Sequence, residues 1–298
     1  MPNASDFALD RRSVRRAFER AAPAYDSTAF LQREVAERML YRLDYMKLAP
    51  ARILDAGCGT GHSVRKLAAR YCEASIVALD FAENMLHAAR DHSPRWKQWW
   101  KPSLPLLGGR LSSYVCGDME QLPLSASSIG LVWSNLALQW CDLGRCVAEA
   151  HRVLEPNGLI MFTTLGPDTL KELRDACAEL DHYQHVNRFI DMHDVGDALV
   201  QAGFADPVMD MEIITITFDD MAAIMRDLKS LGARNHSTAR PPGLTTPRRW
   251  QRVTDRYESF RQAGKLPVTV EVVYGHAWKV PPKSTSDGRQ IIRFRDHP

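Results

Sequence analysis

The feature that most constrains this chain is a short apolar strand that runs directly into closely spaced glycines. Residues 51–55 read Ala-Arg-Ile-Leu-Asp, and Gly57, Gly59 and Gly61 follow at alternate positions. Because glycine has no Cβ, such a loop can turn sharply and approach a ligand closely. Residues 63–71 then show the apolar spacing of a helix. This order is typical of the first unit of a doubly wound α/β sheet, where the loop lies at the ligand crevice.

The rest of the chain continues the alternation of strand and helix. Strands are predicted over residues 75–80, 112–117, 129–134, 159–165, 208–218 and 268–280. Helices are predicted over residues 83–90, 143–154, 168–180, 194–203, 221–231 and 247–262. We therefore expect an α/β fold. Its Rossmann-like doubly wound sheet is mostly parallel with an antiparallel edge strand, and a helical cap is inserted between the last two strands.

The residue before the glycines indicates which ligand the loop binds. A dinucleotide fingerprint requires G-x-G-x-x-G, whereas here the third glycine comes one residue early and His62 takes its place. Asp55 would repel a pyrophosphate, but its carboxylate can accept hydrogen bonds from the ammonium group of a methionine moiety. We therefore predict that the loop binds S-adenosylmethionine. The alternative is a glycine turn with a purely structural role.

Polar residues at three further strand ends fit the other parts of this donor. Asp80 can accept hydrogen bonds from the ribose hydroxyls, although its spacing from Glu83 also fits a helix-capping box. Asp118 can accept from the adenine amino group while Met119 packs on the ring, and the alternative for Asp118 is a turn aspartate. Asn135 follows the fourth strand and would face the donor. Three strand ends thus direct suitable residues at one crevice.

Six segments connect these residues to a known family. They are residues 21–26 (Ala-Ala-Pro-Ala-Tyr-Asp), 134–140 (Ser-Asn-Leu-Ala-Leu-Gln-Trp), 166–174 (Gly-Pro-Asp-Thr-Leu-Lys-Glu-Leu-Arg), 191–194 (Asp-Met-His-Asp), 227–235 (Asp-Leu-Lys-Ser-Leu-Gly-Ala-Arg-Asn) and 273–278 (Val-Tyr-Gly-His-Ala-Trp). On these segments the chain resembles the malonyl-[acyl-carrier protein] O-methyltransferases of biotin synthesis, which are class I methyltransferases. The resemblance implies methylation of the free carboxyl of a malonyl thioester, and the ester then serves as a primer for pimeloyl synthesis.

A second relative leaves an alternative open. The mitochondrial complex I assembly factor that resembles this family shares the Asp-Thr-Leu-x-Glu-Leu-Arg pattern, found here within residues 168–174. A protein of that kind would be an arginine hydroxylase or a non-catalytic factor that binds S-adenosylmethionine. Residues 1–10 lack the features of a clear transit peptide, which disfavours the mitochondrial version.

The resemblance implies a complete set of site residues. The cofactor-binding set is Asp55, Gly57, Gly59, Gly61, Asp80, Phe81, Asp118, Met119, Asn135, Tyr25 and Gln32. The substrate-binding set is Arg234, Gln139, Trp140 and Tyr25. No general base is expected, because a malonyl carboxyl with a pKa of about 4 is already ionised near neutral pH. The alternatives are a surface or structural role for Arg234 and core packing for Trp140.

Basic clusters indicate an acidic partner. One cluster comprises Arg11, Arg12, Arg15, Arg16 and Arg20, and the other comprises Arg240, Arg248, Arg249, Arg252 and Arg256. Such clusters steer an acidic protein and raise its association rate. We assign docking of malonyl-acyl-carrier protein, or binding of malonyl-CoA, to Arg248, Arg249, Arg252 and Arg256. The alternative is a solvated helix face.

Composition excludes several other classes. The net charge is only +2 and no aromatic platform accompanies the arginines, so nucleic acid is not expected. The chain has no long apolar run and no paired cysteines, and His182 with His185 lacks a third ligand. We therefore expect a cytoplasmic, monomeric protein without a metal and without membrane contact.

The predicted elements divide the chain into five parts. Residues 1–48 form an N-terminal helical segment that closes over the cofactor, and residues 49–218 form the Rossmann-like core. Residues 219–267 form the cap on the substrate side, residues 268–280 the final core strand and residues 281–298 a flexible tail. An additional segment, residues 94–109, contains three tryptophans and is assigned to packing or self-association.

Overall fold

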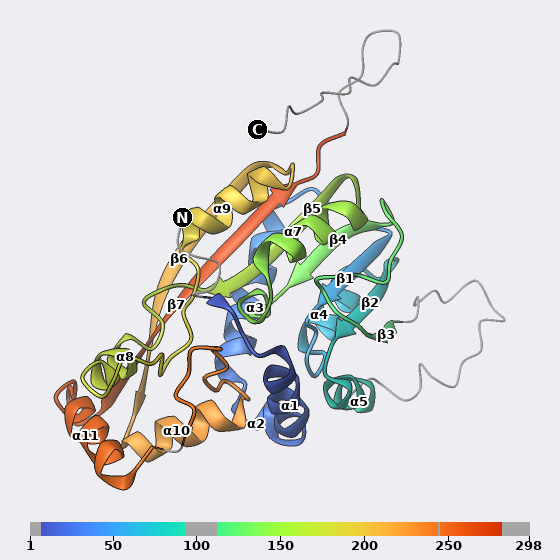
Figure 1. Cartoon of the computed structure of the whole chain (residues 1–298). Coiled ribbons are helices and arrows are strands. Elements are labelled where there is room, and N and C mark those ends of the chain that lie inside the picture. Colours follow the sequence, from blue (N-terminus) through green and yellow to red (C-terminus); the bar gives the residue numbers. More distant parts are fainter. Residues whose placement is uncertain (1–6, 93–111, 244, 282–298) are drawn as a thin grey trace, which may run out of the picture.

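A seven-stranded sheet runs through the molecule in the order β3-β2-β1-β4-β5-β7-β6. The computed structural model describes residues 7–92, 112–243 and 245–281 (Figure 1). The strands are β1 (Arg52–Ala56), β2 (Ser75–Asp80), β3 (Ser113–Cys116), β4 (Ile129–Ser134), β5 (Leu154–Leu165), β6 (Ala205–Phe218) and β7 (Leu266–Trp278). The tryptophan-rich segment and nearly all of the predicted tail lie outside the described residues.

The pairing of the strands confirms the predicted fold class. Strands β1 to β5 are parallel to one another, whereas β7 is antiparallel to both β5 and β6. The antiparallel pair lies at the edge of the sheet, and β6 takes the outermost position. The chain leaves the sheet after β6, builds the cap, and returns through β7 into the gap beside β5.

Helices cover both faces of the sheet because side chains alternate along each strand. In β1, Ile53 belongs to the core on one face and Leu54 to the core on the other. The first core includes residues of α3 (Phe30–Arg42), α4 (His62–Arg70) and α5 (Glu83–Asp91). The second includes residues of α7 (Leu143–Val153) and α9 (Met192–Gln201). The sheet is therefore buried on both sides, as a doubly wound fold requires.

The remaining helices surround the carboxyl ends of the strands. They are α1 (Arg11–Ala21), α2 (Tyr25–Thr28), α8 (Lys171–Cys177), α10 (Met221–Ser230) and α11 (Pro247–Glu258). Strands β6 and β7 extend beyond the rest of the sheet and support α8, α10 and α11, while α1 lies beside α5 (Figure 1). Short 3-10 turns occur at Ala22–Ala24, Leu43–Tyr45 and Leu138–Trp140.

Several predicted boundaries were wrong, including the ends of the helices predicted over residues 168–180 and 247–262, which lie at Cys177 and Glu258. The helix predicted over residues 168–180 begins only at Lys171, because Leu170 has a left-handed backbone with φ of 57°. Strand β5 begins at Leu154 instead of residue 159, because Leu154 already pairs with Ile129 of β4. A register shift separates this pair from the rest of the ladder. Among the described residues, none of the helices has the length and apolarity needed to cross a membrane.

Candidate functional site

The glycine loop at the end of β1 adopts a backbone that requires glycine. Gly57, Gly59 and Gly61 have φ of 79°, 52° and 79°, in the left-handed region. A Cβ on Gly57 would lie 2.4 Å from the Cβ of Ala137. The N–H of Gly57 also donates to the carbonyl of Leu79 over 2.8 Å, which holds the loop against the end of β2.

One cavity lies between this loop, the following strand ends and α1, and we call it the adenosine cavity after the part of the donor predicted to bind there. It encloses about 570 Å³ and is partly open to solvent. It brings together eight of the predicted donor residues: Tyr25, Gly57, Gly59, Asp80, Phe81, Asp118, Met119 and Asn135. Most of its lining is apolar, with few polar groups, which is typical of a pocket for a small organic ligand.

The second cavity lies on the other side of the glycine loop, and we call it the methionine cavity. It encloses about 450 Å³ and is lined by Asp55 and Gln32. Tyr25, Gly59 and Asn135 line both cavities, so the two adjoin along the loop. Gly61 lines neither of them and instead precedes the first turn of α4.

Asp55 is a buried carboxyl group in the lining of the methionine cavity. Its side chain is buried, with 1% of the residue exposed, and Oδ2 has no hydrogen-bond partner. Burial, together with the negative charge of Asp80, raises the pKa of Asp55 to about 8. Gln32 lines the same cavity, and its Oε1 also lacks a partner. Two unsatisfied acceptors in one buried space suit a cationic donor such as an ammonium group.

Asp80 already holds the glycine loop in place. Its carboxylate accepts hydrogen bonds from the N–H groups of Gly59 and Ala82, each over 2.9 Å. Burial raises its pKa to about 6 despite these bonds. The alternative capping role was wrong, because the first N–H groups of α5 donate to the carboxylate of Glu19 on α1. The unused lone pairs of Asp80 remain able to accept from a ligand.

Asp118 has a partner that the sequence did not reveal. The guanidinium of Arg11 donates to Asp118 over 2.7 Å and pairs with Glu120 over 2.7 Å. Arg11 therefore turns inward over the adenosine cavity instead of joining a surface cluster. Phe18, another residue of α1, lines the same cavity and packs edge-on against Trp140 at 5.4 Å. Helix α1 thus covers the adenosine cavity.

The third cavity lies beneath the cap, and we call it the cap cavity. It spans about 1850 Å³, including space open to solvent, and is lined chiefly by apolar side chains of β6, β7, α8 and α10. It shares Gln32 with the methionine cavity and Trp140 with the adenosine cavity. The three cavities therefore converge on Gln32 and Trp140, where a donor and an acceptor can meet.

The predicted substrate residues are distributed unevenly around this junction. Arg234 is exposed and lines the cap cavity, and its guanidinium has no partner among the described residues. Trp140 lines the cavity as predicted, and it is also buried. Gln139 lies outside the linings of all three cavities. Its amide donates to the carbonyl of Leu136 over 2.8 Å and accepts from Thr164 over 3.4 Å.

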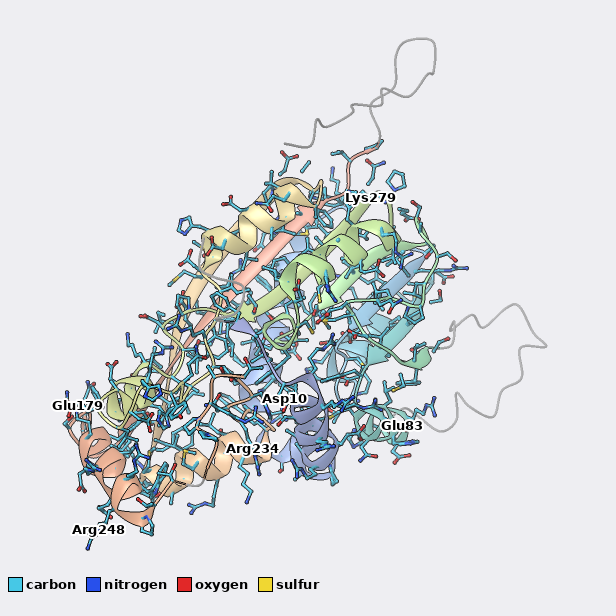
Figure 2. The ribbon with its side chains drawn as sticks, in the orientation of Figure 1. Asp10, Glu83, Glu179, Arg234, Arg248 and Lys279 are labelled. Atoms are coloured by element: carbon cyan, nitrogen blue, oxygen red, sulfur yellow. The ribbon has the colours of Figure 1, made fainter. Side chains whose placement is uncertain are left out.

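The predicted docking arginines do not form a single set. Arg248, Arg252 and Arg256 are exposed and recur every four residues along α11. Arg249 instead turns toward the end of α8, where it pairs with Asp181 over 2.7 Å. Figure 2 shows Arg248 at the far end of α11, well separated from Arg234. Within the described part of the chain, no group of three or more side chains is arranged to hold a metal.

Asn135 connects the two donor cavities to the sheet. Its Nδ2 donates to the carbonyl of Gln32 over 2.9 Å, and its Oδ1 accepts from the hydroxyl of Thr163 over 2.9 Å. This side chain therefore fixes α3 against the ends of β4 and β5. Its position in both linings agrees with the predicted strand end facing the crevice.

Comparison with known proteins gives the family. Residues 54–162 match the family model described as a methyltransferase domain. The chain is 52% identical to the malonyl-[acyl-carrier protein] O-methyltransferase of Gallionella capsiferriformans, over 97% of this chain and 98% of that protein. It is 55% identical to the enzyme of the same name from Nitrosospira multiformis, over 94% and 92%. The chain belongs to the malonyl-[acyl-carrier protein] O-methyltransferase family. The predicted resemblance is confirmed.

Solved structures share the fold at low sequence identity. The YcgJ protein from Bacillus subtilis aligns with a TM-score of 0.57 at 15% identity, over 82% of this chain and 98% of that chain. A putative methyltransferase from Bacillus halodurans aligns with a TM-score of 0.54 at 19% identity, over 82% and 99%. These likenesses support the class I fold of this family member.

The raised pKa of Asp55 predicts how the stability of the ligand-free protein depends on pH. The pKa of the carboxyl lies near its ordinary value of 3.8 in the unfolded chain and rises to about 8 in the folded chain. Between these values the folded chain holds a proton that the unfolded chain has released, so stability falls as pH rises through this window. Asp55→Asn removes that loss. Relative to wild type, the free energy of unfolding of this variant should rise by at least ~1.4 kcal/mol, the equivalent of one pKa unit, across the window.

Urea denaturation near the two ends of the window, at about pH 5 and about pH 8, measures the gain. A stability difference between Asp55→Asn and wild type that stays constant with pH would contradict the assignment. Asp194→Asn is the matched control, because Asp194 lies on α9 and lines neither cavity beside the glycine loop, so its substitution should leave the pH dependence unchanged.

Proposed function

We propose that the protein transfers the methyl group of S-adenosylmethionine to the free carboxyl of malonyl-acyl-carrier protein and forms the malonyl methyl ester. The observation that carries this proposal is the unsatisfied Asp55 carboxylate in a glycine-loop cavity that adjoins a large apolar cavity. The relatives named above supply the acceptor, since both are named for malonyl-acyl-carrier protein. The ester would then enter biotin synthesis as a disguised primer.

The donor residues fit S-adenosylmethionine in one orientation. Its ammonium group would donate to Oδ2 of Asp55 and Oε1 of Gln32, which are the two acceptors without partners. Its ribose would donate to Asp80. Its adenine would lie in the apolar cavity beside Met119, with the amino group toward the Asp118 oxygen that Arg11 leaves free. When bound, it supplies an electrophilic methyl group on a positively charged sulfur.

The acceptor needs positioning more than activation. A malonyl carboxylate is already an anion near neutral pH, because carboxyl pKa values lie at about 4. Its oxygen forms a bond to the methyl carbon as the carbon–sulfur bond breaks, and the opposite charges of carboxylate and sulfonium cancel. Trp140 and the surrounding apolar wall exclude water, which strengthens the attraction between the two charges. Holding the reacting atoms in line supplies most of the rate enhancement.

Arg234 is the residue that we propose for holding the malonyl carboxylate. It lines the cap cavity and is free of partners among the described residues, so its guanidinium is available. One hydrogen bond to one oxygen leaves the other oxygen free to attack. Tyr25 lies between the two donor cavities and would close over the methionine end. The side chain of Gln139 is hydrogen-bonded to Leu136 and to Thr164. We therefore propose that Gln139 helps to hold the neighbouring Trp140 in position.

An activity assay tests the proposed function. Wild-type protein, labelled S-adenosylmethionine and malonyl-acyl-carrier protein should yield a base-labile labelled methyl ester. Arg234→Ala should lower kcat/KM at least about tenfold, the value of one charge-assisted hydrogen bond. Arg226→Ala is the control, because Arg226 is exposed on α10, the cap helix that precedes Arg234, but does not line the cavity. Absence of ester with wild type would refute the function, whereas full activity of Arg234→Ala would refute only that assignment.

Carrier-protein docking is proposed for the exposed face of α11. Arg248, Arg252 and Arg256 offer one positive stripe, and Arg249 contributes the ion pair that fixes the helix to α8. Acyl-carrier proteins are acidic, so such a stripe would steer them toward the cap. The same proposal includes a cytoplasmic location and a monomeric state. It also includes the division of the chain into residues 1–48, 49–218, 219–267, 268–280 and 281–298.

Charge reversal tests this docking face. The double substitution Arg248→Glu and Arg252→Glu should lower kcat/KM for malonyl-acyl-carrier protein about tenfold or more, within the range over which electrostatic steering raises association rates. Turnover of malonyl-CoA should change much less, because it has no protein surface to dock. Lys47→Glu, an exposed change away from α11, serves as the control. Equal losses with both substrates would contradict docking at α11.

A further inference from the structure

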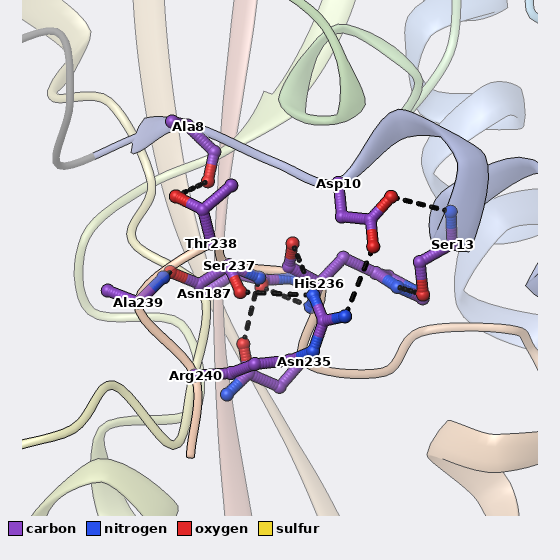
Figure 3. Close-up of polar contacts among 10 residues, drawn as sticks. All are labelled: Ala8, Asp10, Ser13, Asn187, Asn235, His236, Ser237, Thr238, Ala239 and Arg240. Carbon is purple, nitrogen blue, oxygen red and sulfur yellow. Dashed lines mark hydrogen bonds and ion pairs between the residues drawn. The ribbon is translucent and has the colours of Figure 1, made fainter. Parts of the chain in front are cut away.

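The residues before α1 are bound to the cap loop formed by residues 232–240, which we call the latch loop (Figure 3). The N–H of Asp10 donates to the carbonyl of His236 over 2.8 Å, and the N–H of Thr238 donates to the carbonyl of Ala8 over 3.0 Å. These bonds form a short antiparallel bridge between segments more than 200 positions apart in the chain. The chain end that leads into α1 is therefore attached to the cap.

The side chain of Asp10 reinforces this attachment. One carboxylate oxygen accepts the N–H of Ser13 over 3.1 Å and so caps the first turn of α1. The other oxygen accepts from the guanidinium of Arg240 in the latch loop over 3.1 Å. The same carboxylate therefore starts the helix and binds it to the loop (Figure 3).

His236 lies at the centre of the latch loop and is buried, with 2% of the residue exposed. Its Nε2 lies 3.4 Å from the carbonyl of Gly232, which can only accept, so Nε2 carries the proton. Its Nδ1 then accepts from the hydroxyl of Ser13 over 3.0 Å. Burial lowers the pKa of His236, which agrees with this neutral tautomer. The ring therefore joins α1 to the latch loop by two directional bonds.

Further contacts of His236 reach both ligand cavities. Its ring packs edge-on against Trp140, with centroids 5.9 Å apart, and Trp140 lines both the adenosine and cap cavities. The backbone N–H of His236 donates to Oδ1 of Asn187 over 2.9 Å. Nδ2 of Asn187 in turn donates to the carbonyl of Arg234 over 3.1 Å. The backbone that presents Arg234 to the cap cavity is thus fixed through His236.

We propose that His236 is a positioning residue that links closure of α1 over the donor to placement of Arg234 at the acceptor. This inference rests on the proposed function, because it takes the adenosine cavity as the donor site and the cap cavity as the acceptor site. Helix α1 covers the donor site with Arg11 and Phe18, so outward movement of α1 to admit the donor would break the Ser13 bond to His236.

Closure of α1 and ordering of the latch loop then favour each other. A donor that holds α1 closed presents Arg234 in its binding position, and an acceptor bound to Arg234 holds α1 closed. Because coupling between two sites is reciprocal, each ligand should raise the affinity for the other by the same factor.

Isothermal titration calorimetry measures this factor without turnover. S-adenosylhomocysteine, the donor without its methyl group, is titrated into the full-length protein with and without malonyl-CoA. Wild type should bind it at least about fivefold more tightly when malonyl-CoA is present, the lower end of typical coupling. His236→Phe keeps a ring against Trp140 but loses both hydrogen bonds, and its factor should fall to near one.

Companion variants separate positioning from general damage. Ser13→Ala should lose the same coupling as His236→Phe, and the double variant should lose no more than either single variant. His236→Asn, which retains an acceptor near the position of Nδ1, should restore part of the factor. Arg16→Gln is the control, since Arg16 is exposed on α1 and does not contact the latch loop among the described residues. Urea denaturation checks that each variant is folded.

Two results would overturn the inference. One is a wild type whose affinity for S-adenosylhomocysteine does not change with malonyl-CoA. The other is a factor that stays the same in Ser13→Ala, which substitutes a partly exposed residue at the start of α1 and is not expected to unfold the chain. Failure of the proposed function would be recognised by a different result, because wild type would then form no methyl ester in the activity assay.

Discussion

Two buried carboxylates at the ends of neighbouring parallel strands determine the arrangement of this molecule. Asp55 ends β1 and Asp80 ends β2, and burial raises the pKa of each. Asp80 is stabilised by the N–H groups of Gly59 in the glycine loop and of Ala82, whereas Oδ2 of Asp55 has no partner. A fold that buries an unsatisfied carboxylate gives up stability at that position. A cationic ligand over the loop would recover it.

The N-terminal helix and the cap extend this crevice into a site for two ligands. Helix α1 covers one side of the glycine loop and caps α5 through Glu19. The long strands β6 and β7 carry α10 and the latch loop, and these enclose an apolar space beside the donor. Trp140 separates the two spaces and contacts Phe18 and His236, one from each covering segment. The chemistry of transfer between the ligands therefore depends on both covers.

Local patterns predicted the core strands and the strand ends that line the glycine-loop cavities, but they could not predict long-range pairs. The strand that leads into Gly57 and the strand ends at Asp80 and Asp118 could be predicted from the spacing of apolar residues and from the residues that favour turns. Both signals lie within a few neighbouring residues. Three pairs of contacting residues are distant in sequence: Arg11 with Asp118, Asp181 with Arg249, and Ser13 with His236. Their pairing depends on how α1, α8 and the cap pack, so no local signal identifies them.

Proton release on donor binding tests the central claim most directly. At about pH 7 a carboxyl with a pKa of about 8 is mostly protonated, and it must ionise to pair with an ammonium group. Titration of S-adenosylhomocysteine in two buffers of different ionisation enthalpy gives the number of protons released. The account predicts that wild type releases most of one proton and Asp55→Asn releases none. Tight binding to wild type without proton release would contradict it.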